Sequence, residues 1–190
     1  MRVLTYYVAT TLDGFIADPV GGFDFFPLGG EGMEALIDEY PETIPTHLRT
    51  QLGIESPNKN FDAVVMGRRT WEPSLDAGIT SAYQHLQQYV FSRTMTEAPD
   101  ETVTVVGSDP LEYVRDLKRQ DGMGIWLCGG GSLAGALLPE IDELLLKVHP
   151  IVIGNGTPLF RAGFEPHYFT RAESRPFDNG VTLLRLTARR

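Results

Sequence analysis

Short apolar runs recur along the chain and alternate with segments of helical periodicity. The runs at residues 3–10, 63–66 and 125–128 are continuous and rich in β-branched or aromatic residues, as is typical of strands buried on both faces of a sheet. Apolar residues from Met33 to Tyr40 instead recur every three or four positions, which predicts an amphipathic helix. Strands that alternate with helices in this way predict an α/β protein with a mostly parallel sheet.

Two local signals mark the ends of other elements. The sequence Asp-Pro-Leu-Glu at residues 109–112 combines an N-cap aspartate, a proline in the first turn and a glutamate three positions on, so a helix is expected to begin there. Farther on, two apolar segments flank Asp-Asn-Gly at residues 178–180, and Asn-Gly is a strong hairpin signal. The hairpin predicts an antiparallel C-terminal edge for the sheet.

One apolar run in the last third of the chain contains charged or titratable residues. It covers residues 144–153, with Lys147 and His149 set into it. The run predicts one long strand, bent at Pro150.

Composition is that of an ordinary globular protein. The 190 residues are expected to form a single domain, residues 1–190, with a sizeable core. A net charge of −9 argues against nucleic-acid binding, which would need a basic face. A single cysteine, no visible secretory signal and no apolar stretch near the roughly 20 residues of a membrane span predict a cytoplasmic protein without membrane contact.

A glycine-rich run follows the apolar residues 125–128 and leads into a stretch expected to be helical. It reads Gly129, Gly130, Gly131, Ser132 and Leu133. Glycines between a strand and a helix expose backbone N–H groups at the helix N-terminus, where a phosphate can bind. The same glycines would also suit a tight structural connection, and the run alone leaves both interpretations open.

Two other predicted strands lead into loops that contain arginine. The residues concerned are Gly67, Arg68, Arg69, Thr70, Ser92 and Arg93. Cations at a helix start oppose the helix dipole, so in an acidic protein they suggest a bound anion. Parallel sheets bind ligands at the carboxyl ends of their strands, so these loops and the glycine run are expected to converge. Together they suit a 2′-phosphorylated dinucleotide, and the alternative is a set of solvated surface arginines.

Five segments in order carry a family resemblance. They are residues 11–17 (TLDGFIA), 66–72 (MGRRTWE), 90–94 (VFSRT), 127–133 (LCGGGSL) and 150–160 (PIVIGNGTPLF). In these segments the chain resembles the dihydrofolate reductase-like superfamily, in the branch related to the reductase domain of bacterial riboflavin biosynthesis. The resemblance implies a central sheet of about eight strands with helices on both faces. It also implies an NADPH-dependent reductase of a small heterocyclic substrate, such as a pterin or pyrimidine, that pairs as a homodimer.

The resemblance also assigns places to the cofactor. In the family, the segments matching residues 67–70 and 92–93 hold the adenosine phosphates of NADPH, and the loop matching residues 129–133 lies under the pyrophosphate and the nicotinamide ribose. The positions matching Ala9 and Ile16 lie near the nicotinamide ring.

The catalytic acid is expected near the start of the first helix. Hydride transfer to a C=N or C=O bond is helped by an acid near the acceptor. Asp24 is the first choice, because three phenylalanines lie within two positions of it and apolar surroundings raise the pKa of a carboxyl group. An aspartate that caps a turn is the structural alternative. Glu31 and Glu34 are the other candidates. Both also suit the first turn of a helix, where the positive end of the helix dipole favours a carboxylate.

The substrate stays open at this point. The chain lacks both the sequence pattern around the dihydrofolate reductase acid and the Asp-Asn-Pro signature that the riboflavin-pathway reductase carries after the segment matching residues 67–70. Two further alternatives are a non-catalytic nucleotide-binding protein that kept the fold and a flavin-binding protein. The four histidines have no metal-ligand spacing, so no metal is expected.

Overall fold

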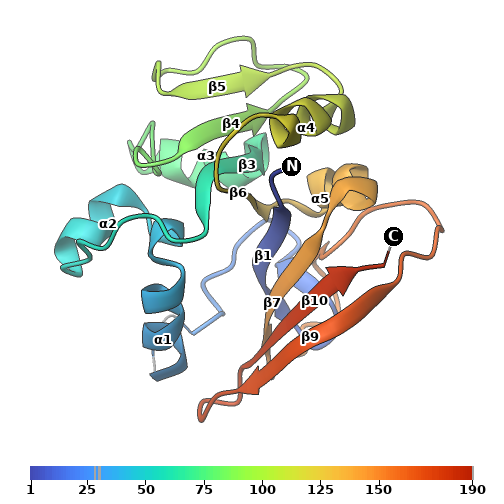
Figure 1. The fold of residues 1–190 in the computed structure, drawn as a ribbon. Helices are drawn as coiled ribbons and strands as arrows, with labels where there is room; N and C mark the ends of the chain where they lie inside the picture. The colour runs from blue at the N-terminus through green and yellow to red at the C-terminus, as the bar shows by residue number, and fades with distance from the viewer. Residues whose placement is uncertain (28, 30, 190) are drawn as a thin grey trace.

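The computed structural model describes residues 1–27, 29 and 31–189, with the backbone alone for residues 31–33. Figure 1 shows a central sheet with helices on its two sides. The strands are β1 (Leu4–Thr11), β2 (Phe15–Ala17), β3 (Phe61–Gly67), β4 (Gln87–Phe91), β5 (Val103–Val106), β6 (Gly124–Gly129), β7 (Glu143–His149), β8 (Thr157–Pro158), β9 (Phe169–Pro176) and β10 (Thr182–Ala188). The helices are α1 (Glu31–Glu39), α2 (Thr46–Gln51), α3 (Arg68–Asp76), α4 (Pro110–Arg119) and α5 (Gly131–Leu137), with short 3-10 helices at Pro41–Thr43 and Leu138–Glu140.

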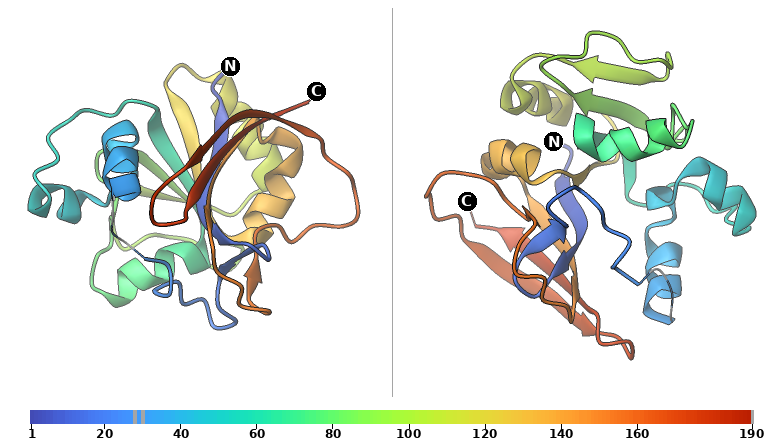
Figure 2. Two further views of the ribbon diagram at one scale, coloured as in Figure 1. Left: turned by 90° about the horizontal axis from the view of Figure 1, so that it is seen from below. Right: turned by 180° about the vertical axis from the view of Figure 1, so that it is seen from behind.

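Within the described residues, eight strands form one sheet in the order β5-β4-β3-β6-β1-β7-β10-β9. The first six strands run parallel, β10 pairs antiparallel with β7, and β9 pairs antiparallel with β10. β2 and β8 form a separate two-stranded ribbon. The predicted fold class is therefore confirmed, and the views from below and behind in Figure 2 show helices on both faces of the sheet.

Side-chain alternation along the parallel strands divides the core into two layers. On β3, Ala63 and Val65 join the cluster under α4 and α5, whereas Val64 and Met66 join the cluster under α1 and α3. Helix residues that are at most 1% exposed complete each layer: Val114, Leu117, Ala134 and Leu137 on the first face, Leu36 and Trp71 on the second. Consecutive strand residues point to opposite faces, so continuous apolar runs fill both layers.

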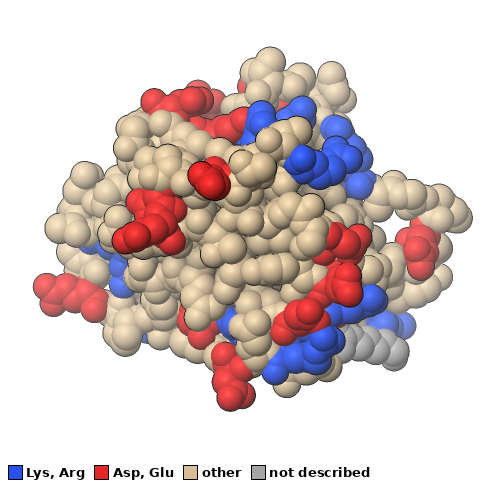
Figure 3. Space-filling view, turned by 90° about the horizontal axis from the view of Figure 1, so that it is seen from above, with Lys and Arg blue, Asp and Glu red and all other residues tan. Residues whose placement is uncertain are grey.

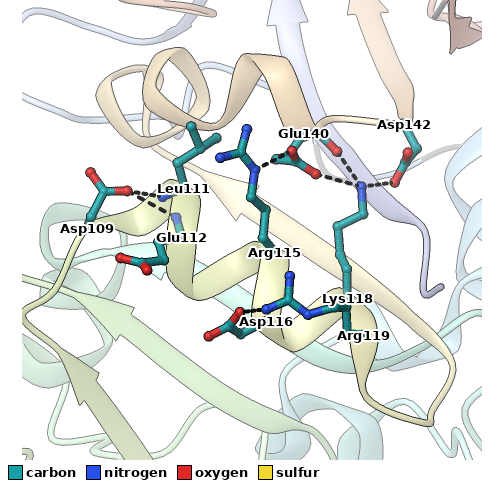
Figure 4. A network of polar contacts seen from close by, with 9 residues as sticks. All are labelled: Asp109, Leu111, Glu112, Arg115, Asp116, Lys118, Arg119, Glu140 and Asp142. Carbon is teal, nitrogen blue, oxygen red and sulfur yellow. Dashed lines mark hydrogen bonds and ion pairs between the residues drawn. The ribbon is translucent and has the colours of Figure 1, made fainter.

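α4 begins as its sequence predicted. The Asp109 carboxylate accepts hydrogen bonds from the backbone N–H groups of Leu111 and Glu112 at 2.9 and 3.0 Å (Figure 4). These bonds pair two of the N–H groups that a helix N-terminus otherwise leaves free. The capping prediction is confirmed.

Buried ion pairs join the amino ends of the parallel strands. Lys118, in the last turn of α4, lies 3.2 Å from a carboxylate oxygen of Glu140 and 2.8 Å from one of Asp142 (Figure 4). Arg2, which precedes β1, pairs with Asp62 of β3. Lys118 is 1% exposed and Arg2 is 5% exposed, so both cations are buried beside their partners.

The C-terminal strands differ from the sequence prediction at one point. β7 ends at His149, so the single strand predicted to reach residue 153 is wrong. Proline has no N–H for a strand ladder, which explains why the strand ends before Pro150. The hairpin between β9 and β10 is confirmed: Gly180 has φ +83° and donates its N–H to the Phe177 carbonyl at 2.9 Å.

The surface mixes charges of both signs. Figure 3 shows basic and acidic side chains interspersed over the face of the molecule that is seen from above. In the part of the chain that the structure describes, no helix is long and apolar enough to span a lipid bilayer.

Candidate functional site

Three loops that leave the carboxyl ends of β3, β4 and β6 lie in contact. Arg68, at the start of α3, donates from Nη1 to Thr94 Oγ1 at 2.9 Å, which links the β3 and β4 loops. Thr70 lies against the glycine run, with its Oγ1 3.3 Å from where a Cβ on Gly130 would stand. The structure therefore brings together the three loops in which the sequence predicted cofactor-binding residues.

The arginines of this region are largely free of protein partners. Arg69 and Arg93 are exposed, and no described residue forms a hydrogen bond or ion pair with either. Arg68 pairs with Glu72 at 2.8 Å across one helical turn. α3 begins after Gly67, which has no side chain to cap the first N–H groups. Unpaired guanidinium and N–H groups are the donors that bind phosphate oxygens.

The glycines of the run serve two purposes. Gly130 has φ +95°, a left-handed conformation that favours glycine. Gly131 and Gly135 instead allow close packing, because a Cβ on either would lie 2.1 Å from the carbonyl oxygen of Pro158 or Arg161, respectively. Gly131 and Gly135 thus permit close packing against β8 and the loop after it, and cofactor contact stays a prediction for the run Gly129, Gly130, Gly131, Ser132 and Leu133.

The other predicted cofactor residues differ in burial. Ser92 is 9% exposed, and its Oγ accepts the backbone N–H of Met95 at 3.0 Å. Leu133 is buried, whereas Ser132 is exposed. Ser92 therefore holds the β4 loop in shape, and Ser132 has its hydroxyl at the surface.

The strands separate between β1 and β6 toward the carboxyl end. The ladder between them covers Leu4 to Tyr6, whereas β1 stays paired with β7 as far as Thr11. Ala9 lies in the stretch that has lost its β6 neighbour, and it is partly buried. Ile16, also partly buried, lies on β2. Parallel sheets bind ligands where neighbouring strands part at their carboxyl ends.

A cavity of about 130 Å³ lies between α1 and the sheet, beside this opening. Its walls include the aromatic residues Tyr7, Tyr83 and Trp126, the α1 residues Leu36 and Ile37, and Lys147. No carboxylate is among the described residues that line it. The cavity is therefore lined by aromatic and aliphatic side chains together with polar groups, among them the hydroxyl of Thr43 and one cationic side chain.

Lys147 has no charged partner in the described structure. Its ammonium lies 4.7 Å from the centre of the Tyr7 ring, and no hydrogen bond or ion pair from a described residue reaches it. Burial lowers the pKa of Lys147 to about 8, because the charged form loses hydration. A cation over an aromatic face is only partly compensated for that loss.

His149 follows on the same face of β7. It is 1% exposed, and neither Nδ1 nor Nε2 has a hydrogen-bond partner among the described residues. Its ring lies 4.8 Å from that of Phe26, centre to centre. Burial and, to a smaller extent, the charge of Lys147 lower the pKa of His149 to about 4, so the imidazole is neutral near pH 7.

The predicted catalytic carboxylates are not among the described residues that line the cavity. Asp24 and Glu34 are exposed, and the side chain of Glu31 lies outside the described residues. The apolar surroundings expected for Asp24 are wrong, because the neighbouring Phe26 is turned into the core, at 5% exposure, while Asp24 lies on an exposed turn. A catalytic role for any of the three stays a prediction.

Lys147 and His149 were not identified as functional residues by sequence reasoning, although a signal was present. Two polar residues two positions apart in an apolar strand lie on the same face. A buried polar side chain costs free energy unless it is hydrogen-bonded, so such a pair in a buried strand suggests a protein partner or a ligand.

The fold and the open carboxyl end of the sheet define an α/β protein with a pyrimidine reductase-like fold. The chain belongs to the RibD C-terminal domain family, whose model matches residues 2–183. The resemblance to the reductase domain of riboflavin biosynthesis is confirmed by this match.

Individual relatives agree with the family. The uncharacterized protein YwjB of Bacillus subtilis (strain 168) is 31% identical over 162 residues, which cover 84% of this chain and 83% of YwjB. The crystal structure of a putative riboflavin biosynthesis protein from Shewanella sp. PV-4 matches with a TM-score of 0.73 and 26% identity, over 100% of both chains. A pyrimidine reductase-like protein from Corynebacterium diphtheriae matches with a TM-score of 0.65 and 17% identity, over 100% of this chain and 92% of its own, and shows the shared fold.

Proposed function

We propose that this protein is an NADPH-dependent reductase that transfers hydride to a small heterocyclic substrate. The observation that carries the proposal is the pair of exposed, unpaired guanidinium groups of Arg69 and Arg93 beside the uncapped start of α3. Membership in a family that includes reductase domains supports the reaction class. Solved structures described as a 5-amino-6-(5-phosphoribosylamino)uracil reductase and as a pyrimidine reductase-like protein support a heterocyclic substrate.

The residues present fit the proposed cofactor. Arginine forms two parallel hydrogen bonds to a phosphate, so Arg68, Arg69 and Arg93 suit the 2′-phosphate that distinguishes NADPH from NADH. Gly129 and Gly130 leave room for a pyrophosphate close to the backbone on the Thr70 side. NADPH supplies the hydride when it is bound.

The reacting end of the cofactor is expected near Ala9 and Ile16. Ala9 lies where β1 has parted from β6, and its register partner on β7 is Lys147. Asp24, on the loop before α1, is the proposed proton donor. Glu31 and Glu34, in the first turn of α1, are the alternatives.

Cofactor titrations test the proposal. Wild-type protein should bind NADPH at least about tenfold more tightly than NADH, since charge-assisted hydrogen bonds contribute about 1.5–3 kcal/mol. Arg69→Ala should remove most of that preference. Arg171→Ala is the matched control, because Arg171 is exposed on β9, away from these loops, and should leave the preference unchanged. Equal, weak affinities for both cofactors in the wild type would refute the phosphate assignment.

Turnover separates the reductase from its alternatives. A panel of pterins and pyrimidines should include a compound that oxidises bound NADPH, seen as loss of its absorbance. A panel that never consumes hydride would favour a non-catalytic nucleotide-binding protein. A yellow purified protein would indicate that a flavin occupies the site.

The assembly and location are also proposals. We expect a homodimer, from the family resemblance, and a cytoplasmic location, from the composition. Light scattering measures the first and fractionation of cells the second.

A further inference from the structure

We propose that the cavity between α1 and the sheet binds the hydride acceptor, and that Lys147 selects an acceptor with a single flat ring and a negative charge. The inference rests on the proposed function, since it assigns the substrate class of the same site. Four observations carry it: the size of the cavity, its aromatic walls, its uncompensated cation and the register of β7 against β1.

The cavity has the size and lining of a site for one aromatic ring. Its volume of about 130 Å³ is close to the roughly 150 Å³ that holds a benzene molecule in a protein core. Tyr7, Tyr83 and Trp126 present aromatic surface to it, and Leu36 and Ile37 close the side toward α1. Flat heterocycles stack well on such walls.

The carboxylates at the end of α1 and in the 3-10 helix that follows it already have partners. Glu39 forms a two-fold ion pair with Arg175, with oxygen–nitrogen distances of 2.5 and 2.7 Å. Glu42 is fully buried and accepts the backbone N–H groups of Lys59, Asn60 and Phe61 at 2.7 to 3.2 Å. Neither carboxylate is left to balance Lys147.

The titratable groups that face Lys147 are neutral near pH 7. Burial raises the pKa of the Cys128 thiol to about 12, and burial also raises the pKa values of Tyr7 and Tyr83. His149, two positions along β7, is a neutral imidazole because burial depresses its pKa. The ammonium of Lys147 is therefore the charge that a bound anion would neutralise.

The register of the sheet brings this cation to the reacting region. Lys147 pairs with Ala9 and His149 pairs with Thr11, and paired parallel strands lie about 4.8 Å apart. Ala9 is the position expected beside the nicotinamide ring, so an acceptor held by Lys147 would lie next to the hydride donor. The unpartnered ring nitrogens of His149 add a second polar group that a ligand could satisfy.

The positive charge of Lys147 favours an acceptor with a negative charge. A carboxylate in such a pocket would suit a ring that is protonated during reduction, whereas an ammonium stabilises a carboxylate or an ionised ring oxygen. The aromatic and aliphatic side chains beside Lys147 lower the local dielectric constant, which strengthens that attraction. Lys147 thus acts as a specificity residue for an acidic monocyclic heterocycle.

Orotate and uracil are matched probes, since they share one ring and differ by a carboxylate. Calorimetric titration without cofactor should show orotate binding wild-type protein at least about tenfold more tightly than uracil. Lys147→Met should abolish the preference and leave uracil binding unchanged. Lys59→Met, the same substitution on a lysine outside the cavity, should keep the wild-type preference.

Several outcomes would overturn the inference. They are failure of orotate to bind the wild type, equal affinity for both probes, or a preference that survives in Lys147→Met. If that variant does not fold, a pH series on the wild type decides instead. Orotate affinity should fall as pH rises through about 8, where Lys147 loses its proton, and a flat profile between about pH 6.5 and 9 would contradict the proposal.

NADPH titrations on the same samples keep this inference separate from the proposed function. NADPH binding without an orotate preference would overturn the acceptor assignment alone. An orotate preference that depends on Lys147, without NADPH binding, would overturn the proposed function and leave the anion pocket standing.

Discussion

At the amino ends of the parallel strands, Lys118 and Arg2 are buried beside carboxylates. Toward the carboxyl ends, the partly buried Lys147 and the buried His149 have no hydrogen-bonding partners among the described residues. Removing a polar group from water costs free energy unless a partner replaces the water. The amino end therefore has its buried charges paired, whereas the carboxyl end retains unpaired groups that lower the stability of the fold. Four changes test this contrast.

The largest effect is expected at the paired lysine. Lys118→Met removes the buried cation that Glu140 and Asp142 share, although Glu140 keeps Arg115 and Asp142 keeps the Leu4 N–H. It should lower the free energy of unfolding by about 3 kcal/mol or more. Urea denaturation measures it. The exposed-lysine control Lys59→Met should change stability by at most about 0.5 kcal/mol. A loss below about 1 kcal/mol at Lys118 would mean that the ion pairs stabilise little.

The contrast in stability between the two ends does not extend to every residue, because one part of the carboxyl end, at Gly131, is tightly packed. Gly131→Ala would put a Cβ 2.1 Å from the Pro158 carbonyl oxygen and should destabilise the protein by about 3 kcal/mol. Gly163→Ala is the control, since no atom lies within 4 Å of its added Cβ. Thermal unfolding compares the two, and equal melting temperatures would show that the loop of β8 moves aside at little cost.

Acid should destabilise the carboxyl end through His149. Its pKa is about 4 when folded and 6.5 in the reference state, so the unfolded chain binds more protons between these values. Stability is therefore lost as pH falls through this window, by about 2–3 kcal/mol at pH 4. His149→Leu should remove that part of the pH dependence. An unchanged slope in the variant would assign the acid sensitivity to other groups.

The smallest effect has the opposite sign. Lys147→Met removes a cation whose pKa burial depresses to about 8, so at pH 7 the variant should be about 2 kcal/mol more stable than the wild type. Urea denaturation of Lys118→Met and Lys147→Met side by side gives the sharpest comparison. A loss of stability at Lys147 would mean that its cation is paired in solution.

Local signals predicted much of the fold and the meeting of the loops proposed to hold the cofactor. The Asp109 cap and the hairpin turn at Gly180 depend on hydrogen bonds within a few residues, so their sequences suffice. The convergence of the loops after β3, β4 and β6 follows from a general property of parallel sheets. The prediction for Asp24 was wrong about its surroundings, because neighbours in sequence need not be neighbours in space.

By itself, the sequence determined the alternation of strands and helices, the hairpin and the positions of glycine and arginine at strand ends. The tertiary structure alone decided which charges are paired. It placed Lys118 between Glu140 and Asp142, and it placed Lys147 opposite Ala9 in an aromatic cavity. The reason is physical: hydrogen bonds of caps and turns form within a few residues, whereas burial and charge pairing depend on strand order and on contacts between distant segments.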